Sequence, residues 1–324
     1  MKNNIVLFII TVIFVLAGYF QLYEKYTEKV SAPKEEIKTE NISDYKYYNF
    51  TSEYFITVKN VRDILLEVSI CIPKSIKGKQ TVKNLKFSVE PQKIENEDES
   101  TTAVFKFKNP EKLTKITVSG QIEVNNYDLL NALKNPSPEQ LYNKERYLSP
   151  EQFIESDNSE IIAKAKELEG KNERQTIKKV YYFVQKNMRY DASKDTKGAV
   201  NALRTKKGKC SDYSALMTAL LRANGIPSRI VSGNIIGKES IEHTRVEVYL
   251  KDLGWVEFEP TIISKSKPDF ALTPGEYMIT GVNTINPLVA KLKIPVKDNR
   301  PRPDIFVLIE GKTTFFNPET NEPI

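Results

Sequence analysis

The stretch KGKCSDYSALMTALLRANGIPSR, residues 207–229, predicts the centre of the fold. From Ser211 to Asn224 apolar residues recur at helical spacing and cover much of the circumference, which indicates a buried helix. Asn224 and Gly225 then form a typical helix end, because both residue types tolerate the left-handed backbone conformation. Cys210 stands immediately before the helix. The segment therefore predicts a cysteine at the start of a central, buried helix.

The segments on either side of this helix differ in their apolar period. Upstream, apolar residues at spacings of three and four predict helices around residues 161–168 and 177–188. Downstream of Pro227, β-prone runs predict strands at 229–232, 244–250 and 255–258. Helices followed by strands favour an α+β fold over a parallel α/β sheet. We expect this α+β domain to span residues 156–263.

Cys210 is placed where a helix can activate a thiol. A helix N-terminus presents free N–H groups and a partial positive charge, and both stabilise a thiolate. Lys206, Lys207 and Lys209 add positive charge nearby, and Gly208 predicts a close backbone approach to whatever occupies the site. A cysteine at a helix start is by itself more often structural, so the interpretation needs partners from elsewhere in the chain.

His243 and Glu259 supply the two partners that a thiol nucleophile needs. His243, the single histidine, alternates with an apolar set that packs inward, so it should face a rim or cleft. Glu259 ends the next predicted strand. It lies on the same face of the sheet as His243 if the connection between the two strands has an odd number of residues, and Gly254 can adopt the left-handed conformation that such connections commonly need. Each residue alone is typical of a surface. Together with Cys210 they provide the nucleophile, the base and the orienting acceptor.

Four segments resemble a transglutaminase-like domain, a branch of the papain-like cysteine enzymes. They are residues 207–216 around Cys210, 220–229, 243–250 from His243, and 254–261 up to and beyond Glu259. The resemblance covers residues 155–263. It implies a papain/transglutaminase-like catalytic domain with Cys210, His243 and Glu259 as catalytic residues, and no cofactor.

Two positions depart from the family pattern. Arg245 stands where the family usually has an aromatic residue, which leaves the geometry of the substrate site open, and Glu259 stands where aspartate is common. Glutamate can still accept a hydrogen bond from imidazole. The oxyanion donor also stays open between the Cys210 backbone N–H and a side chain from Asn187 or Tyr190.

Residues 45–128 predict a small antiparallel β-sandwich that precedes the catalytic domain. Turn-prone segments, among them 95–98 and 109–110, separate β-prone runs at 55–58, 64–72, 82–89, 103–107 and 116–124. Cys71 lies inside one run, where a buried, inert thiol is the usual interpretation. A connector at 129–155 follows the sandwich. A tail at 264–324 is expected to end in a β-hairpin formed by 306–309 and 313–316.

The N-terminus predicts export. Residues 5–20 are almost wholly apolar and follow Lys2, so we expect residues 1–22 to be a signal peptide or a membrane anchor. Residues 23–44 are rich in Lys and Glu and predict a flexible spacer. Everything beyond is then extracytoplasmic, whether membrane-anchored or secreted.

Composition excludes several other classes of protein. The charge of +6 comes from 48 basic and 42 acidic residues that are interspersed, which argues against a nucleic-acid partner. Two cysteines and one histidine make a Cys/His metal site improbable, and a disulfide between Cys71 and Cys210 is not expected. The sequence therefore predicts a peptidase, amidase or transglutaminase acting on protein or peptide amides, including cell-wall peptide. A catalytically silent scaffold or binding module is the alternative.

Overall fold

The computed structural model describes residues 45–59, 64–97, 100–125, 141–192, 195–238, 240–261, 270, 276–285, 288–293 and 306–324. All of them belong to one compact unit, Asp44–Ile324. The predicted leader, the spacer and the first part of the connector lie outside the described residues. No helix among the described residues is long and apolar enough to cross a membrane.

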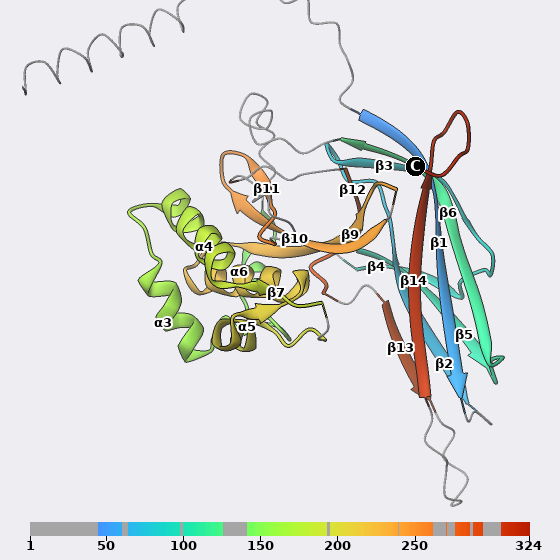
Figure 1. Ribbon diagram of the computed structural model, residues 1–324, viewed down its shortest axis with the longest axis horizontal. Coiled ribbons are helices and arrows are strands. Elements are labelled where there is room, and N and C mark those ends of the chain that lie inside the picture. The colour runs from blue at the N-terminus through green and yellow to red at the C-terminus, as the bar shows by residue number, and fades with distance from the viewer. Residues whose placement is uncertain are drawn as a thin grey trace, which may run out of the picture. The chain divides into compact units, whose positions relative to one another are not determined.

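Two antiparallel sheets form the predicted β-sandwich in the described part of the chain (Figure 1). One sheet has the order β14-β1-β6-β3, formed by Phe306–Phe316, Tyr45–Lys59, Leu113–Asn125 and Gln80–Phe87. The other has the order β13-β2-β5-β4, formed by Leu288–Lys293, Leu65–Ile72, Ser100–Lys108 and Lys93–Glu97. Strict alternation in β2 buries Leu66, Val68, Ile70 and Ile72 in the core between the sheets.

The C-terminal hairpin was a wrong prediction. Residues 306–316 form one continuous strand, β14, that pairs with β1 from Lys59 to Asn49 without a turn. The long edge of β1 offers hydrogen-bond partners along the whole segment, so an unbroken ladder is possible. Gly311 lies opposite Tyr54, and a Cβ there would approach the Tyr54 ring to 3.3 Å. The glycine therefore admits an aromatic ring where a turn was expected.

The turn predicted at 95–98 is also wrong in part. Residues 93–97 form the edge strand β4, which pairs with β5, and any turn must follow Glu97. An edge strand with one exposed face tolerates alternating charged residues, so its polar composition concealed it. Cys71 is half-buried rather than buried, because it points away from the core face of β2.

Helices and a second sheet build the other half of the unit. The helices are α3 (Ser159–Glu167), α4 (Glu173–Asn187), α5 (Ala199–Thr205) and α6 (Cys210–Ala223), and a 3-10 turn, η1, spans Lys144–Tyr147. The sheet has the order β11-β10-β9-β12, formed by Gly254–Phe258, Ile241–Leu250, Ser228–Ile235 and Tyr277–Val282. Arg189–Tyr190 (β7) and Lys207–Gly208 (β8) pair in parallel beside the start of α6. The predicted α+β class is confirmed.

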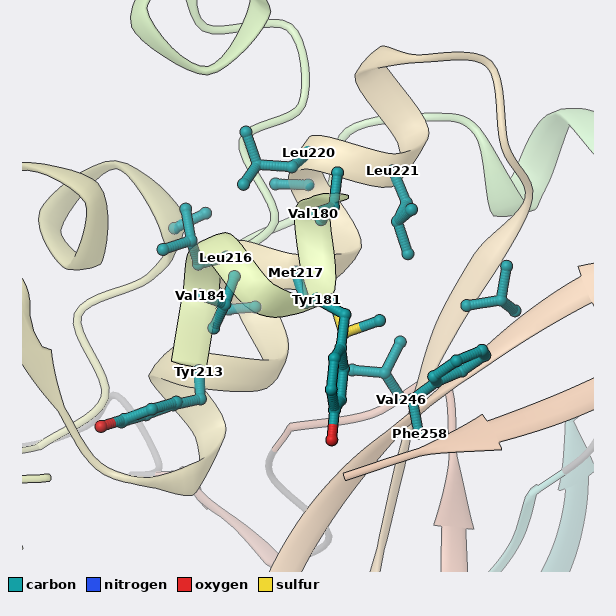
Figure 2. Packing of buried hydrophobic residues seen from close by; sticks show 14 of the residues in the cluster. Val180, Tyr181, Val184, Tyr213, Leu216, Met217, Leu220, Leu221, Val246 and Phe258 are labelled. Carbon is teal, nitrogen blue, oxygen red and sulfur yellow. The ribbon is translucent and has the colours of Figure 1, made fainter. Parts of the chain in front are cut away.

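Helix α6 is buried along its length, from Ser211 to Arg222, as its all-round apolar pattern predicted. Figure 2 shows its apolar side chains meeting those of α4 and of the sheet, among them Val180, Tyr181, Val246 and Phe258. Several elements were missed by the sequence, and two of them build this half of the unit. Helix α5 has only seven residues, and β12 comes from the expected tail but pairs with β9.

The sandwich contacts this sheet through specific polar groups. The Gln80 side chain donates to the Ile279 carbonyl and accepts from the Ile279 N–H, both at 2.8 Å. Ser100 makes the same pair of bonds with Val282, also at 2.8 Å. Lys79 forms an ion pair with the buried Glu247. The strands of the sandwich thus brace β10 and β12. The domain boundaries drawn from the sequence stay a prediction.

Candidate active site

Cys210 is the first residue of α6, as the sequence predicted. Asp212, 2% exposed, fixes this helix start: its carboxylate accepts from the Lys209 N–H at 3.1 Å and from the Lys197 N–H at 2.8 Å. A Cβ on Gly208 would lie 2.5 Å from the Asp212 Cβ. Gly208 therefore makes room for the capping carboxylate, which corrects the expectation that it approaches a ligand.

His243 and Glu259 come together through the register of β10 and β11. Leu250 pairs with Gly254 across the three-residue connection 251–253, and Gly254 has a φ of 77°, so the odd connection and its left-handed glycine are confirmed. The His243 Nε2 lies 2.6 Å from the Glu259 Oε2. The N–H of Thr261 donates to the other carboxylate oxygen at 2.9 Å.

The site is buried, which corrects the expectation of a histidine on a rim. His243 is 1% exposed and Glu259 is 4% exposed. Because Glu259 occupies Nε2, the Nδ1 side of the imidazole is the one left to meet the thiol. The side chains of His243 and Thr244 both act to lower the pKa of the Cys210 thiol, so the sulfur lies near them. The structure therefore brings Cys210 to the histidine that Glu259 holds by a hydrogen bond.

The pKa shifts favour a thiolate–imidazolium pair. Burial acts to raise the pKa of Cys210, but the hydrogen bond and charge of His243 outweigh it and the net shift is downward. Burial acts to lower the pKa of His243, yet its bonds to Cys210 and Glu259 raise it to about 9. For Glu259, burial is opposed by the charges of His243 and Arg245, and the pKa is lowered. For Cys210, His243 and Glu259 alike, the pKa shift favours the charged form of the side chain.

Among the predicted oxyanion donors, the Cys210 N–H and Tyr190 remain available. Residues in the first turn of a helix lack intrahelical acceptors for their N–H groups. Tyr190 pairs with Gly208 across β7 and β8, and its raised pKa arises from burial and from the charge of Cys210. The Asn187 side-chain amide donates to the Phe183 carbonyl at 2.8 Å, back along its own helix. Asn187 is thus the weaker candidate.

The sequence left the role of Arg245 open, and the structure places it among buried carboxylates. It is 1% exposed, and its guanidinium contacts Glu257 at 2.7 Å and Glu259 at 3.3 Å. The sequence contained a signal for this burial. Alternate positions carry Arg245 and Glu247 in one segment, and Glu257 and Glu259 in the next. Opposite charges on the same face of two paired strands predict ion pairs.

A small hollow with a volume of about 50 Å³ lies between the sandwich and the sheet, and its lining includes none of Cys210, His243 and Glu259. Glu242, the residue before His243, lines it together with Tyr54 and Cys71. The Cys71 sulfur lies 3.8 Å from the Thr102 hydroxyl, and both cysteines are thiols of intermediate exposure. Any assay of the Cys210 thiol must therefore account for Cys71.

Comparison with known families assigns the class of this domain. Residues 162–260 match the family model described as the Transglutaminase-like superfamily. This part of the chain is therefore a transglutaminase-like domain, and the resemblance found in the sequence is confirmed for it.

Individual relatives and solved structures match parts of the chain. A stretch of 72 residues is 39% identical to YebA, an uncharacterised protein of Bacillus subtilis (strain 168), over 18% of this chain and 10% of YebA. The chain thus spans about a tenth of that relative. A candidate cysteine protease from Cytophaga hutchinsonii is 16% identical, with a TM-score of 0.59 over 84% of this chain and 93% of that chain. The periplasmic domain of TgpA from Pseudomonas aeruginosa, 12% identical over 64% of this chain and 86% of that chain, has a TM-score of 0.34.

Proposed function

We propose that this protein is an extracytoplasmic cysteine enzyme that acts on amide bonds of proteins or peptides through a thioester acyl-enzyme. One feature carries the proposal: Cys210 begins a buried helix and lies near His243, whose imidazole is hydrogen-bonded to Glu259. A thiol, a base and an acceptor that orients the base are the parts that nucleophilic catalysis requires.

In the first half of the reaction the Cys210 thiolate attacks the amide carbonyl carbon and forms a C–S bond. The Cys210 N–H, with Tyr190 beside it, is placed to stabilise the oxyanion. The C–N bond then breaks, and His243 gives its proton to the departing amine. Glu259 holds the imidazole with Nδ1 toward the sulfur in both protonation states. The product is a thioester on Cys210 and a neutral His243.

In the second half an acceptor releases the acyl group. Water gives up a proton to His243 and forms a C–O bond to the acyl carbon as the C–S bond breaks. A carboxylic acid leaves, the Cys210 thiolate and protonated His243 are restored, and the enzyme is a peptidase or amidase. A lysine amine in place of water yields a new amide and makes it a transglutaminase. The same three residues serve both outcomes. We favour hydrolysis or general acyl transfer on exported proteins and wall peptides.

The rival function is a silent transglutaminase-like scaffold. Its best support in the sequence was Arg245, the departure from the usual aromatic residue. Because Arg245 is buried against Glu257 and Glu259, it does not obstruct a substrate on the sulfur side of His243. That geometry weakens the rival and favours the enzyme. The apolar segment at residues 5–20 supports the export part of the proposal.

The test is incubation of the purified full-length chain with a peptide library, with and without a primary-amine donor. Hydrolysed peptide supports a peptidase, and an amine adduct supports a transglutaminase. Cys210→Ala should abolish both products, whereas Cys71→Ser should retain them. Absence of both products with the wild-type chain, despite a labelled Cys210 thiolate, would favour the scaffold.

A further inference from the structure

A layer of buried charge covers the face of the β9–β12 sheet that bears His243. Its members come from three adjacent strands and are each less than 5% exposed: Arg229, Arg245, Glu247, Glu257 and Glu259. Arg229 pairs with Glu247 at 2.6 Å, and Arg245 pairs with Glu257 at 2.7 Å. Buried charges are costly unless they are paired and hydrogen-bonded. The two arginines and three glutamates leave one negative charge, which protonated His243 balances, so the layer must be closely fitted.

Arg245 occupies the centre of this layer and is held on several sides. Its Nη1 donates to the Glu257 Oε1 at 2.7 Å and its Nε lies 3.3 Å from the Glu259 Oε2. The guanidinium carbon lies 4.3 Å from the centre of the Tyr277 ring. The Tyr277 hydroxyl donates to the His243 carbonyl at 2.7 Å. The same ring thus restrains Arg245 and the backbone of the histidine.

The Glu259 carboxylate is where these contacts converge. In the part of the chain that the structure describes, it accepts from His243 and Arg245 on Oε2 and from the Thr261 N–H on Oε1. A glutamate has one more rotatable bond than an aspartate, so it needs more restraint to hold one orientation. Arg245 and Thr261 supply that restraint from opposite ends of the carboxylate.

Resting on the proposed function, we infer that Arg245 is a positioning residue that locks Glu259 onto His243, and that Glu257 cancels the charge which Arg245 brings. Without Glu257, the guanidinium would compete with imidazolium for Glu259 and repel it. With Glu257, the pair is electrically neutral and leaves the Glu259 charge for His243. Arg245 thereby fixes the orientation of Glu259 without weakening the ion pair between Glu259 and His243.

The other charged and titratable groups around His243 are consistent with a positioning role for Arg245 and a charge-compensating role for Glu257. Cys210 lies near the imidazole at the start of α6, Glu257 lies on β11, Glu259 directly follows β11, and Tyr277 lies on β12. Farther along the same face, Arg229 and Lys79 both pair with Glu247. The Arg245 charge also contributes to the lowered pKa of Glu259, which keeps that carboxylate ionised.

The test uses the full-length chain in a Cys71→Ser background and measures the rate of Cys210 alkylation by iodoacetamide across pH. The informative variant is the double change Arg245→Gln with Glu257→Gln, which keeps the layer neutral and removes the lock on Glu259. We expect the pH at which alkylation reaches half its maximum to rise by about one unit, and the rate near pH 6 to fall about tenfold.

Two further variants separate position from charge. Glu257→Gln alone leaves Arg245 uncompensated, so the His243 pKa should fall. Arg245→Lys keeps the charge but not the forked contact, so the pH at half-maximal alkylation should rise by about as much as in the double variant. The matched control is Arg229→Gln, which breaks an equally buried Arg–Glu pair on the same face but does not touch Glu259; it should keep the wild-type profile.

The inference about Arg245 can be tested independently of the proposed enzymatic activity. The alkylation profile reports the ion pair even if no substrate is found. If the double variant folds, as its circular dichroism and unfolding midpoint would show, and keeps the wild-type profile, the inference is overturned. An equal shift in Arg229→Gln overturns it too, because any buried pair would then have the same effect. Where turnover is measurable, kcat should fall with KM unchanged, since Arg245 does not meet substrate.

Discussion

The two faces of the β9–β12 sheet are both buried, but one is apolar and the other charged. Toward α6 the sheet presents Ile230, Val246, Val248, Val256 and Phe258, each at most 2% exposed. The opposite face presents His243 and the charged layer described above. A single strand, β10, contributes to both by alternation.

The comparison shows how one strand can serve stability and chemistry separately. The apolar face gains free energy from burial without regard to exact orientation. The charged face contributes little net stability, because the cost of desolvating its charges offsets the energy of its ion pairs. Each ion pair forms only in one register of the strands and with one rotamer of each side chain. We therefore expect changes on the apolar side to reduce stability and changes on the charged side to alter the thiol.

The largest expected effect tests the apolar side. Leu220→Ala removes a fully buried side chain of α6 from the core that this sheet shares. The free energy of unfolding should fall by about 2–5 kcal/mol, because a cavity is left in a packed interior. Urea unfolding measures it. The pH profile of Cys210 alkylation should stay as in the wild type; a shifted profile would mean that the two faces are not separable.

The next effect tests the charged side. Activity should fall as pH rises through about 9, where His243 loses the proton it must donate. Glu259→Gln removes a carboxylate that raises the His243 pKa, so this fall should move to lower pH by about one unit or more. The measurement is the pH dependence of kcat, with urea unfolding as a check on stability. An unmoved upper limb would contradict the role of Glu259.

A smaller effect should appear where the faces meet, at the start of α6. Asp212→Ala removes the carboxylate that caps the helix and accepts from the Lys197 N–H. Loss of a cap costs about 0.5–2 kcal/mol of stability. Because the same carboxylate fixes the turn of Cys210, alkylation should also slow at neutral pH. A variant with lower stability but unchanged alkylation would show that the cap does not position the thiol.

The smallest effect lies in the sandwich. Gly311→Ala places a methyl group 3.3 Å from the Tyr54 ring, which must shift by a few tenths of an ångström. We expect a loss below about 1 kcal/mol and no change at Cys210. A loss of several kcal/mol would indicate that residue 311 needs a turn conformation after all.

The sequence predicted the parts of this fold that depend on local period. Helix α6, the strands β10 and β11, and the odd connection before Gly254 all follow from spacing that a single segment contains. The meeting of Cys210, His243 and Glu259 was predicted because the three residues match one mechanism. Strand β4 and the continuous β14 were missed, because their pairing partners, not their own patterns, determine them.

The charged layer was missed for a related physical reason. Alternating Arg and Glu residues on a strand usually indicate a solvated face. Whether such a face is buried depends on what covers it, and here Lys79 and Tyr277 come from distant segments. The sequence likewise left open what Arg245 does to the geometry of the substrate site. Local patterns predicted the candidate nucleophile and its base, whereas tertiary contacts alone reveal how His243 is held.

The most direct test of this account is the ultraviolet absorbance of the Cys210 thiolate in the Cys71→Ser chain, titrated from about pH 5 to 9. The account predicts that the thiolate appears below the ordinary thiol pKa of about 8.5, and that His243→Ala shifts its appearance to that ordinary value or above. A wild-type titration that begins only near 8.5, or one that His243→Ala leaves unchanged, would contradict it.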